Sequence, residues 1–499
     1  MDQLLAKSPR QLMDSDSQRA APPALVVDLD GTLVRGDLTF EMLALCLRWR
    51  PVLFIPVMVQ FCFDKAGAKN RLAVQFADKV DLATLPYEPA VMALIEEAQS
   101  QDRTVALVSG SDHTLVSRIA ARFGIQHVKG TEAGVNLIAE QKSLYLRQAF
   151  GDQFEYVGNA RADYPVWRAG QGGYGVRAPR RAYCLMRSDG SKVVVTPLGE
   201  TGRLFASLLS SLRPHQWMKN LLLFIVPAIQ IMSVSALDVV ALISAFICFS
   251  ALTSSTYLLN DVLDIPDDRR HKTKAERAIA SGRLSIGLAA CVALGLLLFS
   301  LVCSFLISPV FAAISLLYLA VTLAYSFHLK RVAVLDVFTL AGLFSIRVIA
   351  GAYLIGFPPS GWLMTFTGAF FLSLAIGKRY VEVKRHVSTA AVAGRGYVNV
   401  DEAPLLIAGT AIGAMSVLAL LIYGLSAPVT VFQSEAVVLC GAALLMAWVL
   451  RFWLLAGRGE VSDDPVEYAI KDRTSVLLLT FTAFIIAGDL TGPMWQSLF

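Results

Sequence analysis

Most of the C-terminal part of this chain consists of apolar runs, each long enough to cross a lipid bilayer. A hydrocarbon core of about 30 Å requires about 20 apolar residues in a helix, and a backbone in lipid has to satisfy its hydrogen bonds internally. We therefore expect an all-α, multi-spanning membrane bundle of about nine transmembrane helices. With 55% hydrophobic residues, the composition excludes an ordinary soluble protein. Pro227 interrupts the first of the runs, which lie near 220–236, 237–259, 286–306, 308–326, 333–355, 362–380, 404–423, 435–455 and 474–493.

The distribution of Lys and Arg predicts which side of the membrane the loops face. Basic residues lie before the first run and after the second, fourth, sixth and eighth, whereas the intervening loops carry none. The positive-inside rule therefore predicts a multi-pass protein of the inner membrane whose charged loops are cytosolic. Residues 1–20 lack the apolar core of a signal peptide, so we expect a flexible N-terminus and a cytosolic first domain. The formal net charge of +5 is too small to indicate a nucleic-acid partner.

Directly after the second apolar run, the sequence NDVLDIPDDRR gathers carboxylates at the end of a helix. Asn260, Asp264 and Asp268 repeat at four-residue spacing, so on a helix they line one face, with Asp261 beside them. Clustered carboxylates repel one another unless a cation lies between them, and hard oxygen ligands favour Mg²⁺ shared with substrate phosphates. The alternative is a solvated, mixed-charge loop. The basic residues that follow, suited to neutralising a diphosphate, are Arg269, Arg270, Lys272, Lys274, Arg277 and Arg283.

The NDxxDxxxD pattern and its RxIASGRxS-like tail resemble the first aspartate-rich motif of the UbiA superfamily of intramembrane prenyltransferases. This resemblance covers residues 203–499, which we expect to form the membrane transferase domain. It implies that Mg²⁺ is the cofactor and holds a diphosphate leaving group. By the same resemblance the metal ligands are Asn260, Asp261, Asp264 and Asp268, with Asp261 and Asp264 catalytic, and Arg277 and Arg283 bind substrate.

Four polar elements follow strand-like runs in the N-terminal part. The run ALVV ends in DLDGT, which puts Asp28 and Asp30 at one strand end, where two carboxylates serve as nucleophile and proton carrier toward phosphorus. The run TVALVSGSD supplies Ser109, a hydroxyl suited to a phosphate oxygen. Lys142 offers a positive charge for the developing phosphoryl charge. A further strand-like run, FEYVG, is followed by Asn159 and Asp163.

In this order the four elements resemble the haloacid-dehalogenase phosphatases, over residues 21–200. The resemblance implies an α/β Rossmann-like fold with a helical cap at about 38–97. It also implies that Asp28 is the nucleophile, Asp30 the acid/base, and Ser109 and Lys142 the phosphate binders. The Mg²⁺ ligands would be Asp28, Asp30, Asn159 and Asp163. Asn159 is a departure, because many active members carry Asp there and a neutral amide binds Mg²⁺ more weakly. A structural or regulatory relic is the alternative to a working phosphatase.

One segment of the predicted cap, Met42–Phe63, is unusually apolar. Its clean apolar part is too short to span a bilayer, because Arg48, Arg50 and Pro51 interrupt it. Two interpretations stay open at this point. The segment either packs in the core of the cap or rests on the membrane, where it brings the phosphatase to a lipid-borne substrate.

The membrane part lacks the second aspartate-rich motif that most UbiA members carry, since Asp336 is the sole acid in the corresponding region. Arg347 lies inside an apolar helix, where a charge is expensive and functional by default. A structural ion pair between Arg347 and Asp336 is the alternative. The pattern resembles the polyprenyl-phosphate phosphoribosyltransferases, and the substrate-binding residues it implies are Lys219, Asn220, Tyr325, Lys330, Arg347, Lys378 and Arg379.

These resemblances imply a transferase that uses phosphoribosyl pyrophosphate and a polyprenyl phosphate at the cytosolic membrane face. The fused phosphatase would then remove the ribose 5-phosphate, yielding a precursor of envelope polysaccharide. The first alternative is an aromatic, quinone-type prenyltransferase with a vestigial or unrelated phosphatase. A transporter or lipid-binding protein without chemistry is the second. The sequence leaves a homo-oligomer open.

Overall fold

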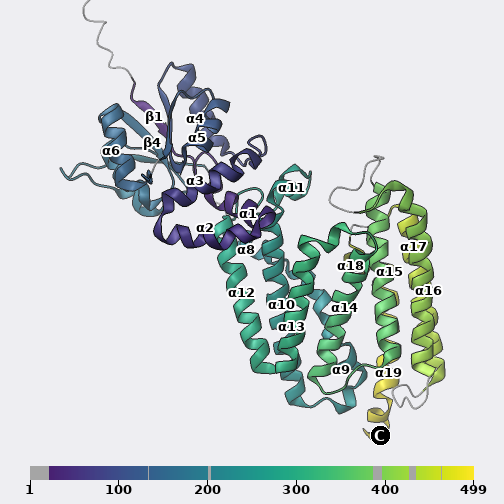
Figure 1. The fold of residues 1–499 in the computed structure, drawn as a ribbon. Coiled ribbons are helices and arrows are strands. Elements are labelled where there is room, and N and C mark those ends of the chain that lie inside the picture. The colour runs from purple at the N-terminus through teal and green to yellow at the C-terminus, as the bar shows by residue number, and fades with distance from the viewer. Residues whose placement is uncertain are drawn as a thin grey trace, which may run out of the picture. The chain divides into compact units, whose positions relative to one another are not determined.

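The computed structural model describes residues 22–132, 134–199, 204–385, 396–425, 434–461 and 464–498 (Figure 1). The flexible N-terminus predicted at residues 1–20 lies outside these ranges. The chain divides into two compact units, each considered by itself. The first unit comprises Met1–Ser211 and Asp261–Ala290, and the second comprises Leu212–Asn260 and Cys291–Phe499.

One parallel sheet forms the centre of the first unit, with strand order β3-β2-β1-β4-β5-β6. The central strand β1 (Ala24–Val27) consists of buried apolar residues, as expected for a strand covered on both faces. This order is that of a doubly wound, Rossmann-like sheet, whose ligands bind at the carboxyl ends where the strand order reverses. The predicted α/β class is confirmed. The other strands are β2 (Val105–Asp112), β3 (His127–Thr131), β4 (Phe154–Gly158), β5 (Gly173–Val176) and β6 (Val195–Leu198).

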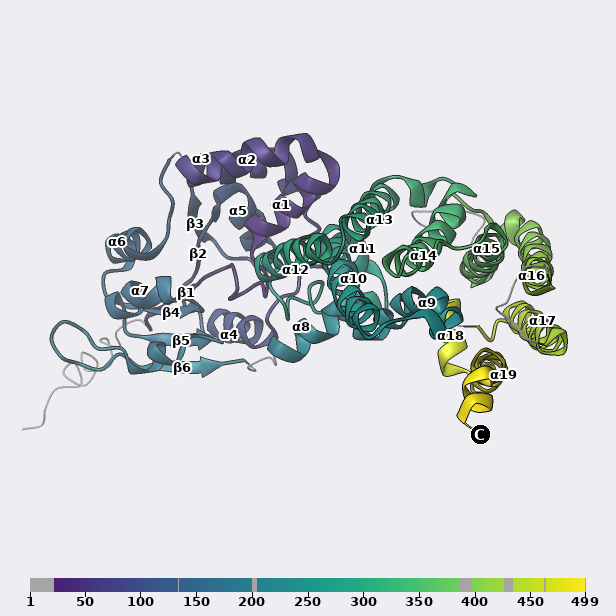
Figure 2. The same ribbon diagram turned by 90° about the horizontal axis from the view of Figure 1, so that it is seen from below.

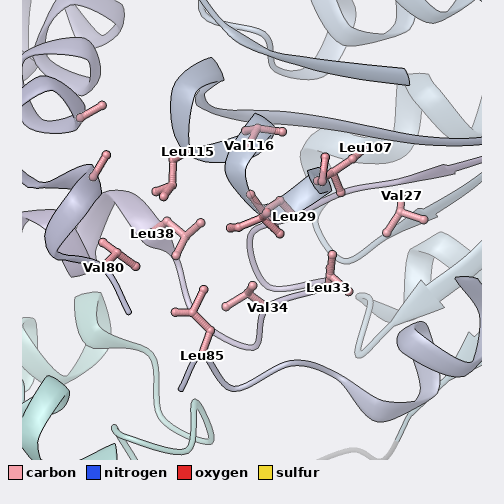
Figure 3. Packing of buried hydrophobic residues seen from close by; sticks show 14 of the residues in the cluster. Val27, Leu29, Leu33, Val34, Leu38, Val80, Leu85, Leu107, Leu115 and Val116 are labelled. Carbon is pink, nitrogen blue, oxygen red and sulfur yellow. The ribbon is translucent and has the colours of Figure 1, made fainter. Parts of the chain in front are cut away.

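Helices cover both faces of this sheet (Figure 2). Leu25 and Val27 of β1 point to one face and join a core to which Leu115 and Val116 also belong (Figure 3). Val26 points to the opposite face, where it belongs to a second core. The first core is covered by α4 (Pro89–Ser100) and α5 (His113–Arg122), and the second by α6 (Ala139–Phe150) and α7 (Tyr164–Ala169).

A helical insertion separates β1 from β2, as predicted for the cap. Asp37 caps its first helix by accepting the N–H groups of Thr39 and Phe40. Arg50 separates the first two helices, and Pro51 begins the second, a position that suits its missing N–H. The apolar segment predicted at 42–63 therefore forms two helices rather than one. The helices of the insertion are α1 (Leu38–Trp49), α2 (Pro51–Phe63) and α3 (Lys65–Phe76).

Long helices make up the second unit, and neighbours in sequence pack on one another from α13 to α17. Within the described residues, seven helices are long and apolar enough to cross a membrane. They are α10 (Ala236–Leu263), α12 (Ile286–Ile307), α13 (Pro309–Phe327), α14 (Leu335–Leu354), α15 (Gly361–Arg385), α16 (Glu402–Leu425) and α17 (Glu435–Arg458).

The predicted number of nine spans is approximate, because the first and the last of the predicted runs differ from long membrane-spanning helices. The run predicted at 220–236 does not form one long helix, because a 3-10 segment, Pro214–Phe224, is followed by the short helix α9 (Ile225–Ile229). Pro227 lies inside this interrupted stretch. The last predicted run coincides with α19 (Arg473–Leu498), of which Arg473–Ile485 is apolar. Two shorter helices are α8 (Leu204–Leu212) and α18 (Pro465–Lys471).

Close backbone packing fixes the middle of the bundle at one glycine of α14. A Cβ atom at Gly351 would lie 1.8 Å from the carbonyl oxygen of Leu223, so only a residue without a side chain fits. Gly342, on the same helix, has nothing within 4 Å of the corresponding position. Small residues that let backbones approach closely are typical of helix interfaces in membranes.

Replacing Gly351 by Ala should therefore destabilise the bundle, whereas Gly342→Ala should not. Overpacking against backbone costs about 1–3 kcal/mol, while Ala gains up to about 1 kcal/mol over Gly in a helix. The measurement is the temperature at which half of each variant is lost from the monodisperse fraction in detergent. Equal midpoints for the two variants would contradict this packing.

Candidate active sites

The carboxyl ends of β1, β2 and β4 open into a pocket of about 540 Å³ in the first unit. Asp28 directly follows β1, Ser109 lies in β2, and Asn159 directly follows β4. Because parallel strands end at the same edge of a sheet, residues far apart in sequence meet here. All six predicted phosphatase residues line this pocket: Asp28, Asp30, Ser109, Lys142, Asn159 and Asp163.

Lys142 of α6 is the centre of a buried network at the base of the pocket. Its ammonium donates to Asp28 at 2.8 Å and to the hydroxyl of Tyr156 at 3.0 Å. Tyr156 in turn donates to Asp163 at 2.8 Å. Lys142 and Asp28 are both buried, so the ammonium holds the Asp28 carboxylate, the predicted nucleophile, in one orientation.

Asp30 is held by three donors from two elements, β2 and α1. The hydroxyl groups of Ser111 and Ser109 donate to its carboxylate at 2.6 Å and 3.2 Å, and the backbone N–H of Leu38 donates at 2.8 Å. Leu38 is the first residue of α1, so the cap begins at the predicted acid/base residue. These bonds hold the Asp30 carboxylate in one orientation.

Asn159 and Asp163 also line the pocket. The Asn159 amide covers Gly31, where a Cβ atom would lie 2.0 Å from the amide nitrogen, and Gly31 has a φ of +72°. Only glycine suits this turn. Asp163 accepts the backbone N–H groups of Asn159 and Ala160 at 3.0 Å and 2.9 Å, so it orders the loop that carries Asn159. Its predicted role as a metal ligand stays a prediction.

The donor set at this pocket fits a small divalent cation. Asp28, Asp30, Asp37 and Asp163 face the two cations Lys69 and Lys142, which leaves an excess of negative charge. Within the described ranges no group of three or more carboxylate, His or Cys side chains is close enough to hold a metal alone. A Mg²⁺ ion here would therefore rely on Asp28, the Asn159 amide, backbone oxygen, water and substrate phosphate, which matches its preference for mixed oxygen shells.

Burial changes the titration of the two central carboxyl groups. Burial raises the pKa of Asp28 to about 7, although the Lys142 ammonium acts to lower it. Burial and the charge of Asp37 raise the pKa of Asp30 to about 6, against the lowering effect of the Leu38 N–H. Burial also tends to lower the pKa of Lys142, but Asp28 and Asp163 outweigh it and raise that pKa. The lysine is therefore a permanent cation in the pocket.

Three residues in or next to this pocket were missed from the sequence. Lys69 of α3 lines the pocket and donates to the Gly110 carbonyl at 2.6 Å. Ser111 and Tyr156 hold Asp30 and Lys142, as described above. Lys69 comes from the cap, whose lysines carry no motif, whereas Ser111 is two residues after Ser109 in VSGSD, a signal that strand alternation could have supplied.

The aspartate-rich loop is the second site, and part of it differs from the prediction. Asn260, Asp264 and Asp268 do not share one continuous helix face, because α10 ends at Leu263 and α11 (Ile265–Arg270) begins after Asp264. Pro266 contributes to the break, because it has no N–H to donate to the carbonyl of Val262 and its ring would clash there in a continuous helix. Asp264 instead occupies the N-cap position of α11.

One guanidinium group joins two of the loop carboxylates. Arg277 donates to Asp268 at 2.7 Å and to Asp261 at 3.1 Å. Burial raises the pKa of Asp268 to about 6, although Arg277 acts to lower it. The two carboxylates converge on one positive charge, so their oxygens form a donor set that also fits Mg²⁺.

The other arginines of the loop have structural partners within the first unit. Arg269 forms a bidentate pair with Glu41 of α1 at 2.7 Å and 3.1 Å, and Arg270 pairs with Asp81 at 3.0 Å. Arg283 is exposed and donates to Ser281 at 3.1 Å, which closes the loop on itself. The prediction that Arg269 and Arg270 neutralise a diphosphate is therefore not supported by their contacts.

Arg347 of α14 is a buried cation in the second unit. It donates to the side-chain oxygen of Asn220 and to the hydroxyl of Tyr318, both at 2.9 Å, and its guanidinium lies over the Tyr318 ring. Among the described residues no carboxylate forms an ion pair with it, and Asp336 pairs with Arg379 instead. The alternative of an Arg347–Asp336 pair is wrong. A cation held by neutral groups is suited to an anionic ligand.

Arg379 contrasts with Arg347, because carboxylates compensate it. Its guanidinium contacts Asp336 and Glu382, each at 2.5 Å, and donates to Tyr325 at 2.8 Å. It is completely buried. These contacts are typical of a structural ion pair, and the prediction that Arg379 and Tyr325 bind substrate stays untested.

A third basic cluster in the second unit contains an acid that the sequence analysis missed. Lys219 pairs with Asp464 at 2.5 Å. Burial acts to raise the pKa of Asp464, but Lys219 and Lys378 lower it to about 2. Asp464 therefore stays ionised between the two predicted phosphate-binding lysines. The acidic pair before Pro465 was the available signal.

Lys330 lies in a 3-10 turn, Leu329–Arg331, and is partly exposed.

These folds and sites define a two-part protein: an α/β domain with a carboxylate-rich pocket at its strand ends and a polytopic membrane bundle with buried cations. A model of the UbiA prenyltransferase family matches residues 221–468, and one of haloacid dehalogenase-like hydrolases matches residues 25–167. The chain belongs to the UbiA prenyltransferase family and carries a haloacid dehalogenase-like hydrolase domain. It is therefore an integral membrane protein of the transferase type.

Relatives exist both for the whole chain and for its membrane part. Protein y4nM of Sinorhizobium fredii is 34% identical over 93% of this chain and 90% of its own length. A decaprenyl-phosphate phosphoribosyltransferase of Mycolicibacterium smegmatis is 33% identical over 58% of this chain and 92% of its own length. A solved UbiA homologue from Archaeoglobus fulgidus, bound to DMAPP and Mg²⁺, has 17% identity and a TM-score of 0.45, covering 56% of this chain and 99% of its own.

The titration of Asp28 and Asp30 predicts a bell-shaped pH profile for phosphatase activity at limiting Mg²⁺. The predicted nucleophile Asp28 has to be ionised, so activity should fall as the pH drops below its pKa of about 7. The predicted acid Asp30 has to be protonated, so activity should fall as the pH rises above its pKa of about 6. The optimum should lie between these values. Initial rates on a soluble phosphomonoester test this, with Asp28→Asn as the blank. A flat profile across the range would contradict the assignment.

Asn159 predicts weak metal binding that one substitution should correct. Asn159→Asp adds a charge to a pocket that already has excess carboxylate, so without Mg²⁺ the variant should be less stable than the wild type. With Mg²⁺ it should reach half-maximal activity at about tenfold lower metal concentration. Metal titration with thermal melting measures both effects. An unchanged metal requirement would mean that Asn159 does not contact the metal.

Proposed function

We propose that this protein transfers 5-phosphoribosyl from phosphoribosyl pyrophosphate to a polyprenyl phosphate and that its hydrolase domain then removes the 5-phosphate. The observation that carries this proposal is the similarity to a decaprenyl-phosphate phosphoribosyltransferase over 92% of that relative's length. Domain limits at 21–200 and 203–499, with both sites on the cytosolic side of the inner membrane, belong to the same proposal. The product would serve as a pentose donor for envelope polysaccharide.

The aspartate-rich loop is assigned to the diphosphate of the donor. Asp261 and Asp268 already converge on one cation, and Asn260 and Asp264 flank them in sequence. When bound there, Mg²⁺ would neutralise the diphosphate and make it a better leaving group. Arg277 contacts both carboxylates, so we assign its guanidinium to stabilise the negative charge on the diphosphate as it leaves.

The basic residues of the bundle are assigned to the remaining phosphates. The donor's 5-phosphate and the lipid phosphate both require cations, and Arg347 is a buried cation whose hydrogen-bond partners are neutral. Lys219 pairs with Asp464, and Lys378 also acts on that carboxylate, so we assign these two lysines to the remaining phosphate. Lys330 completes the assignment.

The chemistry of the transfer matches this supply of charges. The bond from ribose C1 to the diphosphate oxygen breaks and pyrophosphate leaves, while an oxygen of the lipid phosphate bonds to C1 from the opposite face. The acceptor is already anionic, so no side chain has to remove a proton. The residues contribute positioning and electrostatic stabilisation.

In the hydrolase domain, Asp28 attacks the phosphorus of the 5-phosphate and Asp30 donates the proton to the departing ribose oxygen. Lys142 and Ser109 contact the phosphoryl oxygens. Water then releases phosphate from Asp28, with Asp30 now accepting the proton from that water. The Lys142 ammonium, buried beside Asp28, stabilises the charge that develops on the phosphoryl group.

Membranes that contain the protein should convert ribose-labelled phosphoribosyl pyrophosphate and polyprenyl phosphate into lipid-linked ribose. The same membranes should not prenylate 4-hydroxybenzoate with geranyl diphosphate. Asp261→Asn should lower transfer about a hundredfold or more, whereas Asp238→Asn, at the other end of α10, should leave it unchanged. Turnover of the aromatic acceptor without ribosyl transfer would establish the quinone-type alternative instead.

The hydrolase step is tested separately by Asp28→Asn. This variant should accumulate lipid-linked ribose 5-phosphate at an undiminished rate of transfer, and mass spectrometry distinguishes the two lipids by one phosphate. If the wild type itself yields the 5-phosphate as its end product, the domain is a relic and the transferase assignment is unaffected.

A further inference from the structure

The cap helix α2 (Pro51–Phe63) has an apolar face that the first unit leaves uncovered. Val52, Ile55, Val59 and Phe63 are 86%, 71%, 53% and 88% exposed. Their spacing places them on one side of the helix. The helix contains no charged residue and buries only Val57. At 13 residues it extends about 20 Å, which is too short to cross a bilayer.

The helix before it is attached to a loop that joins two membrane spans. Arg48 of α1 donates to the carbonyl of Leu263, the last residue of span α10, at 3.0 Å and pairs with Asp267 at 2.6 Å. At the other end of the loop, a Cβ atom at Gly287 in span α12 would lie 3.1 Å from the Phe40 ring. All of these residues belong to the first unit.

A buried ion pair strengthens this attachment. Glu41 of α1 and Arg269 of the loop are each 5% exposed at the side chain and form two hydrogen bonds. The cap is therefore attached to the residues at which α10 ends and α12 begins. Only Arg50 separates α1 from α2, so α2 starts one residue after the helix that makes these contacts.

The flanking charges match a helix that lies in the interface. Arg48 and Arg50 precede the apolar run, Lys65 follows it, and Arg50 and Lys65 are exposed. Long basic side chains at the ends of an apolar helix extend to the lipid headgroups while the apolar face enters the acyl boundary. The inner side of the same helix faces the hydrolase site, because Met58 and Phe61 line the pocket of Asp28.

We propose that α2 is an interfacial helix whose apolar face inserts into the membrane surface at which α10 ends and α12 begins. Its inner side forms the wall of the hydrolase pocket, so the pocket receives a phosphomonoester carried on a membrane lipid. The choice of substrate rests on the proposed function, whereas insertion of the helix does not.

Insertion is tested with a native residue of the helix. Cys62 is exposed on α2, and the other exposed cysteines are Cys184, Cys291 and Cys440. The full chain with Ser at those three positions is labelled at Cys62 with an environment-sensitive fluorophore and reconstituted in phosphatidylethanolamine–phosphatidylglycerol vesicles. The control retains Cys184, in the same unit, and has Ser at Cys62.

The Cys62 label should show blue-shifted emission and be quenched by a quencher attached to the lipid chains, and the Cys184 label should show neither. Water-like emission at Cys62 would overturn the proposal. Blue-shifted emission without lipid quenching would also overturn it, because a second copy of the chain would then cover the face.

The link to the substrate is tested with charge on the exposed face. Val59→Glu should raise the KM for a lipid-borne phosphomonoester about tenfold and leave kcat/KM for soluble ribose 5-phosphate unchanged. Val194→Glu, at a 65% exposed valine elsewhere in the unit, should change neither. Equal loss on both substrates would overturn the proposed role. If the wild type hydrolyses neither substrate, the proposed hydrolase step fails, while the label experiment still decides on insertion.

Discussion

The bidentate ion pair between Glu41 and Arg269 makes the aspartate-rich loop part of the same compact unit as the hydrolase domain. Both side chains are buried, and removing one partner from such a pair leaves an uncompensated charge at a cost of about 3–5 kcal/mol. Arg269 also donates to the carbonyl of Ala280 at 3.0 Å, so one guanidinium fixes two parts of the loop. The conformation of the aspartate-rich loop thus depends on a helix of the hydrolase-like domain.

Elsewhere in the protein, a buried charge that has a partner of opposite charge is structural, whereas a buried charge with only neutral partners is a candidate for ligand binding. Arg379 has two carboxylate partners and needs no ligand, whereas Arg347 has neutral partners and a charge that is still to be balanced. The opposite imbalance exists beside Lys142, where carboxylates outnumber lysines and raise the affinity for a cation. An uncompensated charge is costly in a low-dielectric interior, so each imbalance marks a place where a ligand of opposite charge stabilises the protein.

The sequence was sufficient to predict site residues where the local pattern of the chain and the topology of the sheet agree. Asp28, Ser109 and Asn159 follow strand-like runs, and a parallel sheet brings such strand ends together whatever the loops do. One error was avoidable, because Pro266 breaks the predicted common helix face. The alternative of an Arg347–Asp336 pair could also have been excluded, since the two residues are 11 positions apart on one helix, about 16 Å along its axis. Lys69, Asp464 and the Glu41–Arg269 pair depend on contacts between distant segments, which no spacing encodes.

Under the proposed function, the fusion of the two domains would have a physical consequence. A polyprenyl-linked sugar phosphate would stay in the membrane after transfer, so a hydrolase free in solution would meet it only by collision with the surface. A hydrolase on the same chain is at a high effective concentration, which raises the rate of the second step without any new contact. This benefit requires that the pocket reach the lipid surface. A cap with a charge-free, exposed helix is a liability in water, and at a membrane surface the same helix meets that requirement.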